Sequence, residues 1–151
     1  MELQIESERA MGEFGEKLGK ALTGSEVIEL VGDVGAGKTT LVKGLARGLG
    51  IDEDVQSPTF TISRIYQTGD DSKLAHYDFY RLTEPGILQL EIQESVADTS
   101  SIVVIEWGDI VEGVLPKDRL TIRIEPSTQH ARVLSLSAGG DQSRRLVELL
   151  Q

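Results

Sequence analysis

Apolar side chains in the first third of the chain recur every three or four residues. The first stripe begins after Ser7, a common N-cap residue, and predicts an amphipathic helix. A second stripe runs from Lys38 to Leu49, and Gly50 follows where a helix commonly ends. Residues 26–31 lie between the two stripes and form a short, mostly apolar run typical of a strand. The first stripe consists of Met11, Phe14, Leu18 and Leu22.

Later in the chain the pattern changes to runs and alternations typical of strands. Residues 102–105 are four consecutive branched aliphatics, as in a strand that is buried on both faces. Residues 120–126 and 131–137 alternate apolar and polar side chains, which predicts a half-exposed antiparallel pair. Further expected elements are a β-rich segment over 57–66, a strand over 73–80, a helix that follows the Pro-Gly break within 83–96, and a closing helix over 141–150.

The run GDVGAGKT at residues 32–39 matches the pattern G-x-x-x-x-G-K-[ST]. It lies between a predicted strand and a predicted helix, which is the context that this motif requires. Glycines let consecutive N–H groups turn toward phosphate oxygens, and the helix N-terminus adds partial positive charge. We therefore predict a nucleotide-binding P-loop rather than a chance glycine turn. The predicted contacts are Gly32, Asp33, Val34, Gly35, Ala36, Gly37, Lys38, Thr39 and Thr40.

Within this loop two side chains have distinct expected roles. Lys38 is expected to reach the β- and γ-phosphates, and the Thr39 hydroxyl to bind Mg²⁺. Guanine-specific enzymes usually read the base with an Asn-Lys-x-Asp element, and this chain contains no asparagine. ATP is therefore the expected nucleotide by elimination. Together these features predict an α/β, P-loop NTPase-like three-layer fold with a mixed central sheet, forming a single ATPase domain over residues 1–151.

The buried run at 102–105 is followed by Glu106 and Trp107. P-loop enzymes use a carboxylate at the end of a buried strand as a second Mg²⁺ anchor, so Glu106 is a candidate metal ligand or catalytic residue. The alternative is a strand-end glutamate in a surface salt bridge. Trp107 is the chain's only tryptophan, and it either packs near the nucleotide or anchors the core.

A third cluster is HYDFYRL at residues 76–82. Alternation along a strand would place His76, Asp78 and Tyr80 on one side and the intervening residues on the other. Asp78 would then orient a water molecule or extend the magnesium shell. A buried Asp–Arg or Asp–Tyr pair that holds a turn is the equally open alternative.

Composition bears on whether this protein binds nucleic acid, crosses a membrane or is secreted. The net charge is −10, and phosphate binding needs clustered Lys and Arg, so the chain is not expected to hold nucleic acid alone. There is no cysteine, and no apolar run approaches the roughly 20 residues needed to cross a bilayer. The N-terminus is acidic and lacks an apolar signal core. We therefore expect a cytoplasmic protein.

Three motifs together carry a resemblance to one protein family. GDVGAGKTTLVKGLARGLG, SPTF at 57–60, and HYDFYRL followed by IEWGD closely resemble the TsaE family, also called YjeE. These are small bacterial P-loop ATPases needed to form threonylcarbamoyladenosine on tRNA. The resemblance covers nearly the whole chain. One departure is Glu91, where the family usually has glycine, in a helix that is a candidate partner surface.

The resemblance implies a role for each matching residue. Lys38 and Thr39 would serve the phosphates and Mg²⁺, and Glu106 would be the Walker B-type carboxylate. Asp78 would be the essential second acid, so the implied catalytic residues are Lys38, Asp78 and Glu106. Thr59 would belong to a switch-like loop near the γ-phosphate, and Trp107 would lie near the nucleotide.

The family also implies partners, namely the scaffold TsaB and the transferase TsaD, with tRNA held by them. Of the nine arginines, only Arg81 lies inside a motif, so no arginine finger is evident. We therefore expect slow ATP hydrolysis by this chain alone and stimulation by the TsaB–TsaD pair. Two alternatives use the same loop: a small-molecule kinase, and a nucleotide-dependent binding module with little hydrolysis.

Overall fold

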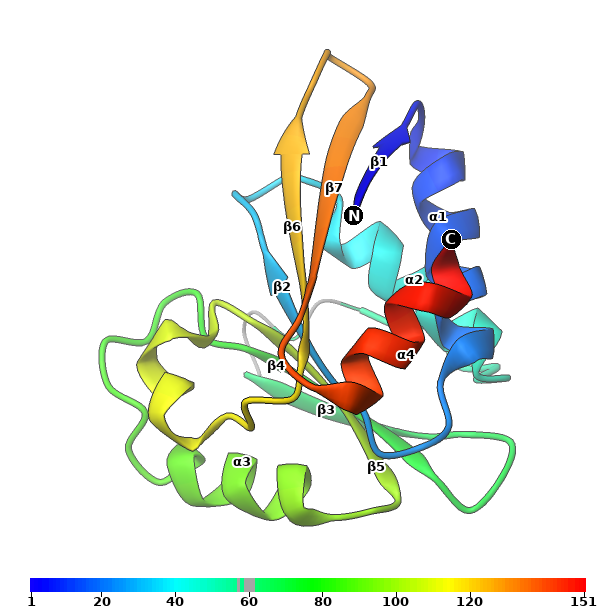
Figure 1. The fold of residues 1–151 in the computed structure, drawn as a ribbon. Helices are drawn as coiled ribbons and strands as arrows, with labels where there is room; N and C mark the ends of the chain where they lie inside the picture. Colours follow the sequence, from blue (N-terminus) through cyan, green and yellow to red (C-terminus); the bar gives the residue numbers. More distant parts are fainter. Residues whose placement is uncertain (57, 59–61) are drawn as a thin grey trace.

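The computed structural model describes every residue of the chain except 57 and 59–61. The described residues form one seven-stranded sheet in the order β1-β7-β6-β2-β5-β4-β3, with helices on both faces (Figure 1). The strands are β1 (Glu2–Ile5), β2 (Val27–Val31), β3 (Ser63–Gln67), β4 (Lys73–Asp78), β5 (Ser101–Glu106), β6 (Leu120–Pro126) and β7 (Arg132–Ala138). The helices are α1 (Glu8–Ala21), α2 (Lys38–Gly48), α3 (Leu88–Ala97), α4 (Asp141–Leu150) and the 3₁₀ helix η1 (Gly108–Val114).

Strand direction changes from the centre of the sheet to its edges. The four central strands, β6, β2, β5 and β4, run parallel to one another. β7 pairs antiparallel with β6 and β1, and β3 pairs antiparallel with β4. The mixed sheet and the β6–β7 pair confirm the sequence predictions. Residues 102–105 form an unbroken aliphatic run because β5 is central and covered on both faces.

Each face of the sheet has its own hydrophobic cluster. α1, α2 and α4 cover one face, where Leu41 and Val104 are fully buried. α3 and η1 cover the other face, where Tyr77 and Ile105 are fully buried. Consecutive residues of β4 and β5 therefore point into different layers, as expected for a strand.

Helices α1 and α2 pack in close backbone contact. A Cβ atom on Gly15 would collide with the carbonyl oxygen of Leu41, and one on Gly44 with that of Gly12. Only residues without a side chain permit this approach, so these glycines set the position of α2 relative to α1. The amino end of α2 directly follows the 32–39 loop, and its placement matters for the site.

Several element boundaries differ from the sequence prediction. The strand expected over 73–80 ends at Asp78. The helix expected after the Pro-Gly break in 83–96 begins at Leu88, as predicted. Gly86 has a φ of 53° and the Leu88 N–H donates to the Pro85 carbonyl, so a turn precedes this helix. β1 and η1 were not anticipated. β1 has four residues and exists through pairing with β7, more than 120 residues away, which local patterns do not reveal.

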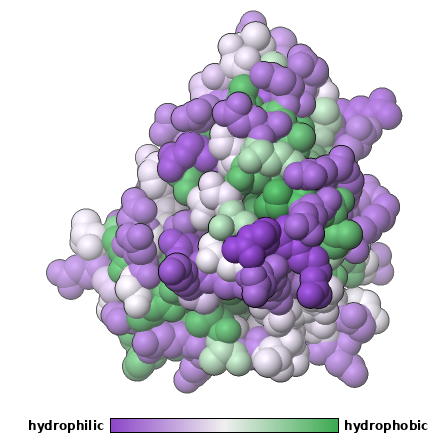
Figure 2. Space-filling view, viewed as in Figure 1, coloured by the Kyte–Doolittle hydropathy of each residue, from purple (hydrophilic) through white to green (hydrophobic). Residues whose placement is uncertain are grey.

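Side-chain exposure follows the layer structure. In the view of Figure 2 the surface is mostly hydrophilic, with hydrophobic residues in separate groups, some of them over α3. Ile87 and Leu90 are the large exposed apolar residues in that segment. Across the residues that the structure describes, none of the helices has the length and apolar character to cross a membrane.

Candidate functional site

Three neighbouring parallel strands end at the same edge of the sheet. β4 ends at Asp78, β5 ends at Glu106, and β2 runs directly into residues 32–39, called here the glycine loop. In the sheet register Asp78 lies beside Glu106, and Glu106 lies beside Leu30. Open α/β sheets bind ligands in the crevice outside such carboxyl ends.

Two glycines of the loop have a left-handed backbone. The φ angle is 82° at Gly35 and 111° at Gly37, conformations that other residues adopt only with strain. Gly37 is also the N-cap of α2, so no side chain caps the first N–H groups of that helix. Uncapped N–H groups at a helix N-terminus, together with its partial positive charge, form an anion-binding site.

The remaining loop residues have separate positions. The Asp33 carbonyl accepts a hydrogen bond from the Ala36 N–H at 3.0 Å, which closes the turn of the loop. The Val34 side chain is 68% exposed. The Thr40 hydroxyl donates to Glu8 Oε1 of α1 at 3.4 Å, so it is directed away from the strand ends.

Lys38 is buried at the centre of the site. Its Nζ donates to the Gly32 carbonyl at 2.6 Å, lies 3.9 Å from Glu106 Oε1, and lies 4.5 Å from the centroid of the Trp107 ring. Burial lowers the pKa of the Lys38 ammonium below its ordinary value, although three nearby carboxylates act to raise it. These are Glu106, Asp78 and Asp33. A desolvated cation attracts phosphate more strongly than one in water.

Glu106 is also buried, with 2% of its surface exposed. Its Oε2 accepts a hydrogen bond from His76 Nε2 at 2.6 Å, and its Oε1 faces Lys38. The alternative of a surface salt bridge does not fit this burial. The carboxylate therefore lies between an imidazole and a buried lysine, and it remains a candidate metal ligand or catalytic residue.

Asp78 is buried beside Glu106, with 5% of its surface exposed. Its Oδ1 accepts a hydrogen bond from the Tyr80 N–H at 3.0 Å, which holds the turn after β4. Its own N–H donates to the Ile62 carbonyl at 2.8 Å. Asp78 therefore supports a turn, and it also lies close enough to Lys38 to act on its pKa.

Trp107 turns the chain out of β5 directly after Glu106. Its φ of 57° is left-handed, which is uncommon for a residue with a side chain and costs about 1 kcal/mol or more. The indole is partly exposed, contacts the Tyr80 ring at 4.9 Å between centroids, and lies over Lys38. Trp107 also packs against the hydrophobic cluster under α3 and η1, so the indole borders both the core and the site. It belongs to the same cluster as the glycine loop.

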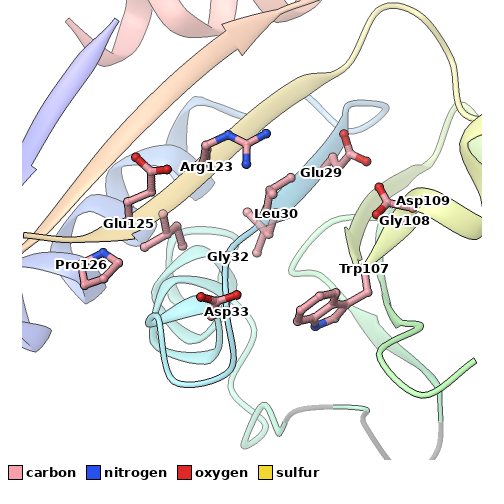
Figure 3. Close-up of a pocket in the computed structure, with 12 residues that line it drawn as sticks. Glu29, Leu30, Gly32, Asp33, Trp107, Gly108, Asp109, Arg123, Glu125 and Pro126 are labelled. Carbon is pink, nitrogen blue, oxygen red and sulfur yellow. The ribbon is translucent and has the colours of Figure 1, made fainter.

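Two cavities flank the glycine loop. The tryptophan-side cavity, about 470 Å³, is lined by the end of β2, by Trp107 and by β6 residues 123–126. Figure 3 shows Trp107 and Asp33 near one end of it and Arg123 and Glu29 near the other. The hairpin-side cavity, about 490 Å³, is lined by residues 35–40, by the start of α1 and by the β6–β7 hairpin. The hairpin contributes Gln129, His130 and Arg132.

The structure identifies two site residues that sequence reasoning missed. His76 bonds Glu106, although the sequence placed it only on the side of Asp78. Arg132 Nε donates to the Ala36 carbonyl at 3.1 Å and so connects β7 to the glycine loop. Nothing in the local sequence signalled Arg132, because the contact joins residues 96 positions apart. Thr59 lies outside the described residues.

Comparison with known proteins identifies the family. The model of the family described as threonylcarbamoyl adenosine biosynthesis protein TsaE matches residues 5–134. This chain belongs to the TsaE family. Its resemblance to that family in sequence is thereby confirmed.

Curated TsaE proteins are similar over most of their length. The chain is 42% identical to tRNA threonylcarbamoyladenosine biosynthesis protein TsaE of Streptomyces coelicolor, over 76% of this chain and 78% of that protein. It is 38% identical to the Bacillus subtilis protein of the same name, over 83% and 77%. Similarity to TsaE proteins therefore covers the strand ends and the glycine loop.

A solved structure shares the fold. The crystal structure of Bacillus subtilis YdiB matches with a TM-score of 0.82 at 29% identity, covering 99% of this chain and 93% of that chain. The mixed α/β architecture is therefore that of a known protein.

Proposed function

We propose that this TsaE-family chain binds and hydrolyses ATP–Mg²⁺ as the ATPase subunit of the bacterial machinery that makes N6-threonylcarbamoyladenosine on tRNA. The observation that carries the proposal is the meeting of Lys38 and Glu106. Their charged atoms lie 3.9 Å apart, both side chains are buried, and Lys38 belongs to the glycine loop. A buried cation beside a buried carboxylate, next to an uncapped helix N-terminus, suits a polyphosphate with a divalent cation.

The phosphates would be held by the glycine loop. The N–H groups at the start of α2 and the Lys38 ammonium both favour negative charge. Lys38 now donates to the Gly32 carbonyl, so we expect it to exchange this bond for one to the β- and γ-phosphates. The exchange is favourable because a charge-assisted bond to phosphate is stronger than one to a neutral carbonyl.

The nucleoside would occupy the hairpin-side cavity. This cavity is lined by residues 35–40, and its volume of about 490 Å³ is in the range of small-molecule sites. Gln129 and His130 lie at its rim on the β6–β7 hairpin and offer an amide and an imidazole to a base. ATP remains the proposed nucleotide, since the guanine-reading element is absent from the sequence.

Mg²⁺ fits the side chains that are present. We assign it to the Thr39 hydroxyl and Glu106, where it would neutralise charge on the β- and γ-phosphates. Within the part of the chain that the structure describes, no group of three or more His, Cys, Asp or Glu side chains forms a protein-only metal cage. This suits Mg²⁺, which usually keeps several waters and takes one or two carboxylates plus phosphate oxygens.

Hydrolysis needs a water molecule in line with the terminal phosphate. Asp78 is the neighbour of Glu106 in the sheet and is proposed to orient that water and accept its proton as its oxygen bonds to the γ-phosphorus. The bond between the γ-phosphorus and the bridging oxygen then breaks, leaving ADP and phosphate. Lys38 stabilises the charge that develops on the phosphate oxygens. Trp107 covers one side of Lys38 and limits its access to bulk water.

The proposed partners are TsaB and TsaD, with tRNA held by them and not by this acidic chain. Its net charge of −10 favours association with basic protein surfaces, and that association should weaken as salt rises. A partner that supplies an arginine or reorders the site would raise the hydrolysis rate, by about 10³–10⁵-fold for an arginine finger. Thr59 is proposed as part of the responding element by resemblance to the family. The proposed setting is the cytoplasm.

Phosphate release from ATP tests the proposal, with the chain alone and with added TsaB–TsaD pair. We expect slow release alone and faster release with the pair, and a weaker response in Thr59→Ala. A flat rate while binding is shown independently would contradict partner activation. Transfer of phosphate to a panel of hydroxyl acceptors would instead favour the kinase alternative, and nucleotide binding without release would favour a binding module.

A further inference from the structure

The closest polar contact of Glu106 is with a histidine on the neighbouring strand. His76 Nε2 lies 2.6 Å from Glu106 Oε2, and the two side chains are 1% and 3% exposed. In the parallel register of β4 and β5, Asp78 is beside Glu106 and His76 is beside Val104. His76 therefore lies on the same face of the sheet as both acids, one step further from the strand ends.

The other ring nitrogen of His76 has no hydrogen-bond partner in the part of the chain that the structure describes. Among the residues that the structure describes, His76 Nδ1 is the buried side-chain atom that makes no hydrogen bond. A proton on Nδ1 would leave a buried donor unpaired, which is costly. The proton therefore belongs on Nε2, where it is donated to Glu106. Among the described residues, the hydrogen bond to Glu106 is therefore the one that the His76 ring makes.

This bond distinguishes the two oxygens of the carboxylate. Rotation about the last bond of a glutamate side chain has only broad preferences, so packing and hydrogen bonds decide its orientation. His76 holds Oε2, and Oε1 is left facing Lys38 at 3.9 Å. Without the imidazole, the carboxylate would be free to turn toward Lys38 with either oxygen, or to pair with it more closely.

We propose that His76 is a positioning residue that fixes the Glu106 carboxylate so that Oε1 is presented to the metal. The proposal rests on the proposed function, since it assumes that Glu106 helps to bind Mg²⁺ beside the phosphates. His76 itself touches neither nucleotide nor metal. Side chains that orient a metal ligand in this way commonly change metal affinity or activity by about 10–100-fold when removed.

Three substitutions separate positioning from simple packing. His76→Leu removes the donor, and His76→Gln keeps an amide N–H at about the distance of Nε2 along the side chain. His76→Asn carries the same amide but is too short to place it there. Tyr77→Phe is the matched control. It removes a partly buried hydrogen bond of 2.6 Å to Ser95 from the next residue of β4, on the opposite face.

The measurement is Mn²⁺ binding to each full-length variant saturated with ADP, followed by electron paramagnetic resonance, with ADP affinity in the absence of metal and a thermal melt measured alongside. We expect His76→Leu and His76→Asn to bind Mn²⁺ about 10–100-fold more weakly, with ADP affinity unchanged. His76→Gln should recover much of the loss. Tyr77→Phe should lower the melting temperature without changing Mn²⁺ affinity.

The outcomes are distinguishable from failure of the proposed function. If wild-type protein with ADP binds no Mn²⁺, the metal site and the positioning role are both wrong. If wild type binds Mn²⁺ and folded His76→Leu binds it equally well, only the positioning role is wrong. Should His76→Leu fail to fold, the other two variants still decide. Equal Mn²⁺ affinity in His76→Gln and His76→Asn would overturn the proposal, and tighter Mn²⁺ binding by His76→Gln than by His76→Asn would support it.

Discussion

Two buried glutamates stand at opposite ends of the central strands and differ in how they are satisfied. Glu26, just before β2 at its amino end, is 5% exposed, and Glu106 at the carboxyl end of β5 is 2% exposed. Glu26 accepts four hydrogen bonds, from the N–H and hydroxyl of Thr23 and from the N–H groups of Gly24 and Ser25. Glu106 accepts one hydrogen bond, from His76, and its other oxygen lies 3.9 Å from the Lys38 ammonium.

The difference separates a structural carboxylate from one available for chemistry. All of the Glu26 partners lie within three residues, so its own turn satisfies both of its oxygens. Burial acts to raise the pKa of Glu26, but these hydrogen bonds outweigh burial and hold that pKa below its ordinary value. Glu106 keeps one oxygen facing a cation. Burial alone therefore does not distinguish the two glutamates, whereas their hydrogen bonding does.

The largest expected effect comes from Glu106→Gln. The amide keeps the shape of the side chain and a polar atom near His76 but loses the charge. We expect ATP hydrolysis to fall by about 10²–10⁴-fold, as for loss of an acid–base or charge-stabilising group. Thermal melts beside phosphate-release rates check this. An unchanged rate per folded molecule would contradict a chemical role for Glu106, and Asp78→Ala should behave in the same way.

Thr39→Ala compared with Thr40→Ala sharpens the metal assignment. The two hydroxyls are neighbours, but that of Thr40 is engaged with Glu8 of α1 at 3.4 Å. We expect Thr39→Ala to need a higher Mg²⁺ concentration for half-maximal hydrolysis, because it loses a metal ligand. Thr40→Ala should leave the Mg²⁺ dependence unchanged. Equal shifts of the half-maximal Mg²⁺ concentration in both variants would contradict the assignment of the Thr39 hydroxyl as a metal ligand.

Glu26→Gln should alter stability and leave the chemistry alone. The amide loses charge-assisted bonds and leaves donors imperfectly paired, so the free energy of unfolding should fall by about 1–3 kcal/mol at neutral pH. Chemical denaturation measures this, and phosphate release per folded molecule should match wild type. If Glu26→Gln lost ATPase activity at normal stability, the assignment of a purely structural role to Glu26 would be wrong.

The same variant gives a pH prediction. The pKa of Glu26 is lowered in the folded protein from a value of 4.5, so its contribution to stability is present above that pH and is lost as the pH falls through the folded pKa. The difference in unfolding free energy between wild type and Glu26→Gln should therefore narrow in acid. Denaturation curves at neutral and acid pH test this, and a gap that widens in acid would be the contrary result.

Local sequence patterns predicted what local interactions determine. The glycine loop lies between β2 and α2 as expected, and Glu106 closes a buried strand. The His76–Glu106 pair was not predictable, because it depends on β4 being the parallel neighbour of β5, and a single sequence does not specify which strands pair. β1 and Arg132 were missed for the same reason, since their contacts span 96 residues or more.

The most direct test of the proposed ATP site compares ATP turnover by Lys38→Ala and by Glu26→Gln, at matched folded fractions and with the TsaB–TsaD pair present. Both variants alter a buried charged residue, but of the two residues only Lys38 lies in the glycine loop. We expect Lys38→Ala to fold and to lose ATP hydrolysis, whereas Glu26→Gln should be less stable and hydrolyse ATP at the wild-type rate. Wild-type hydrolysis by folded Lys38→Ala would contradict the assignment of the site.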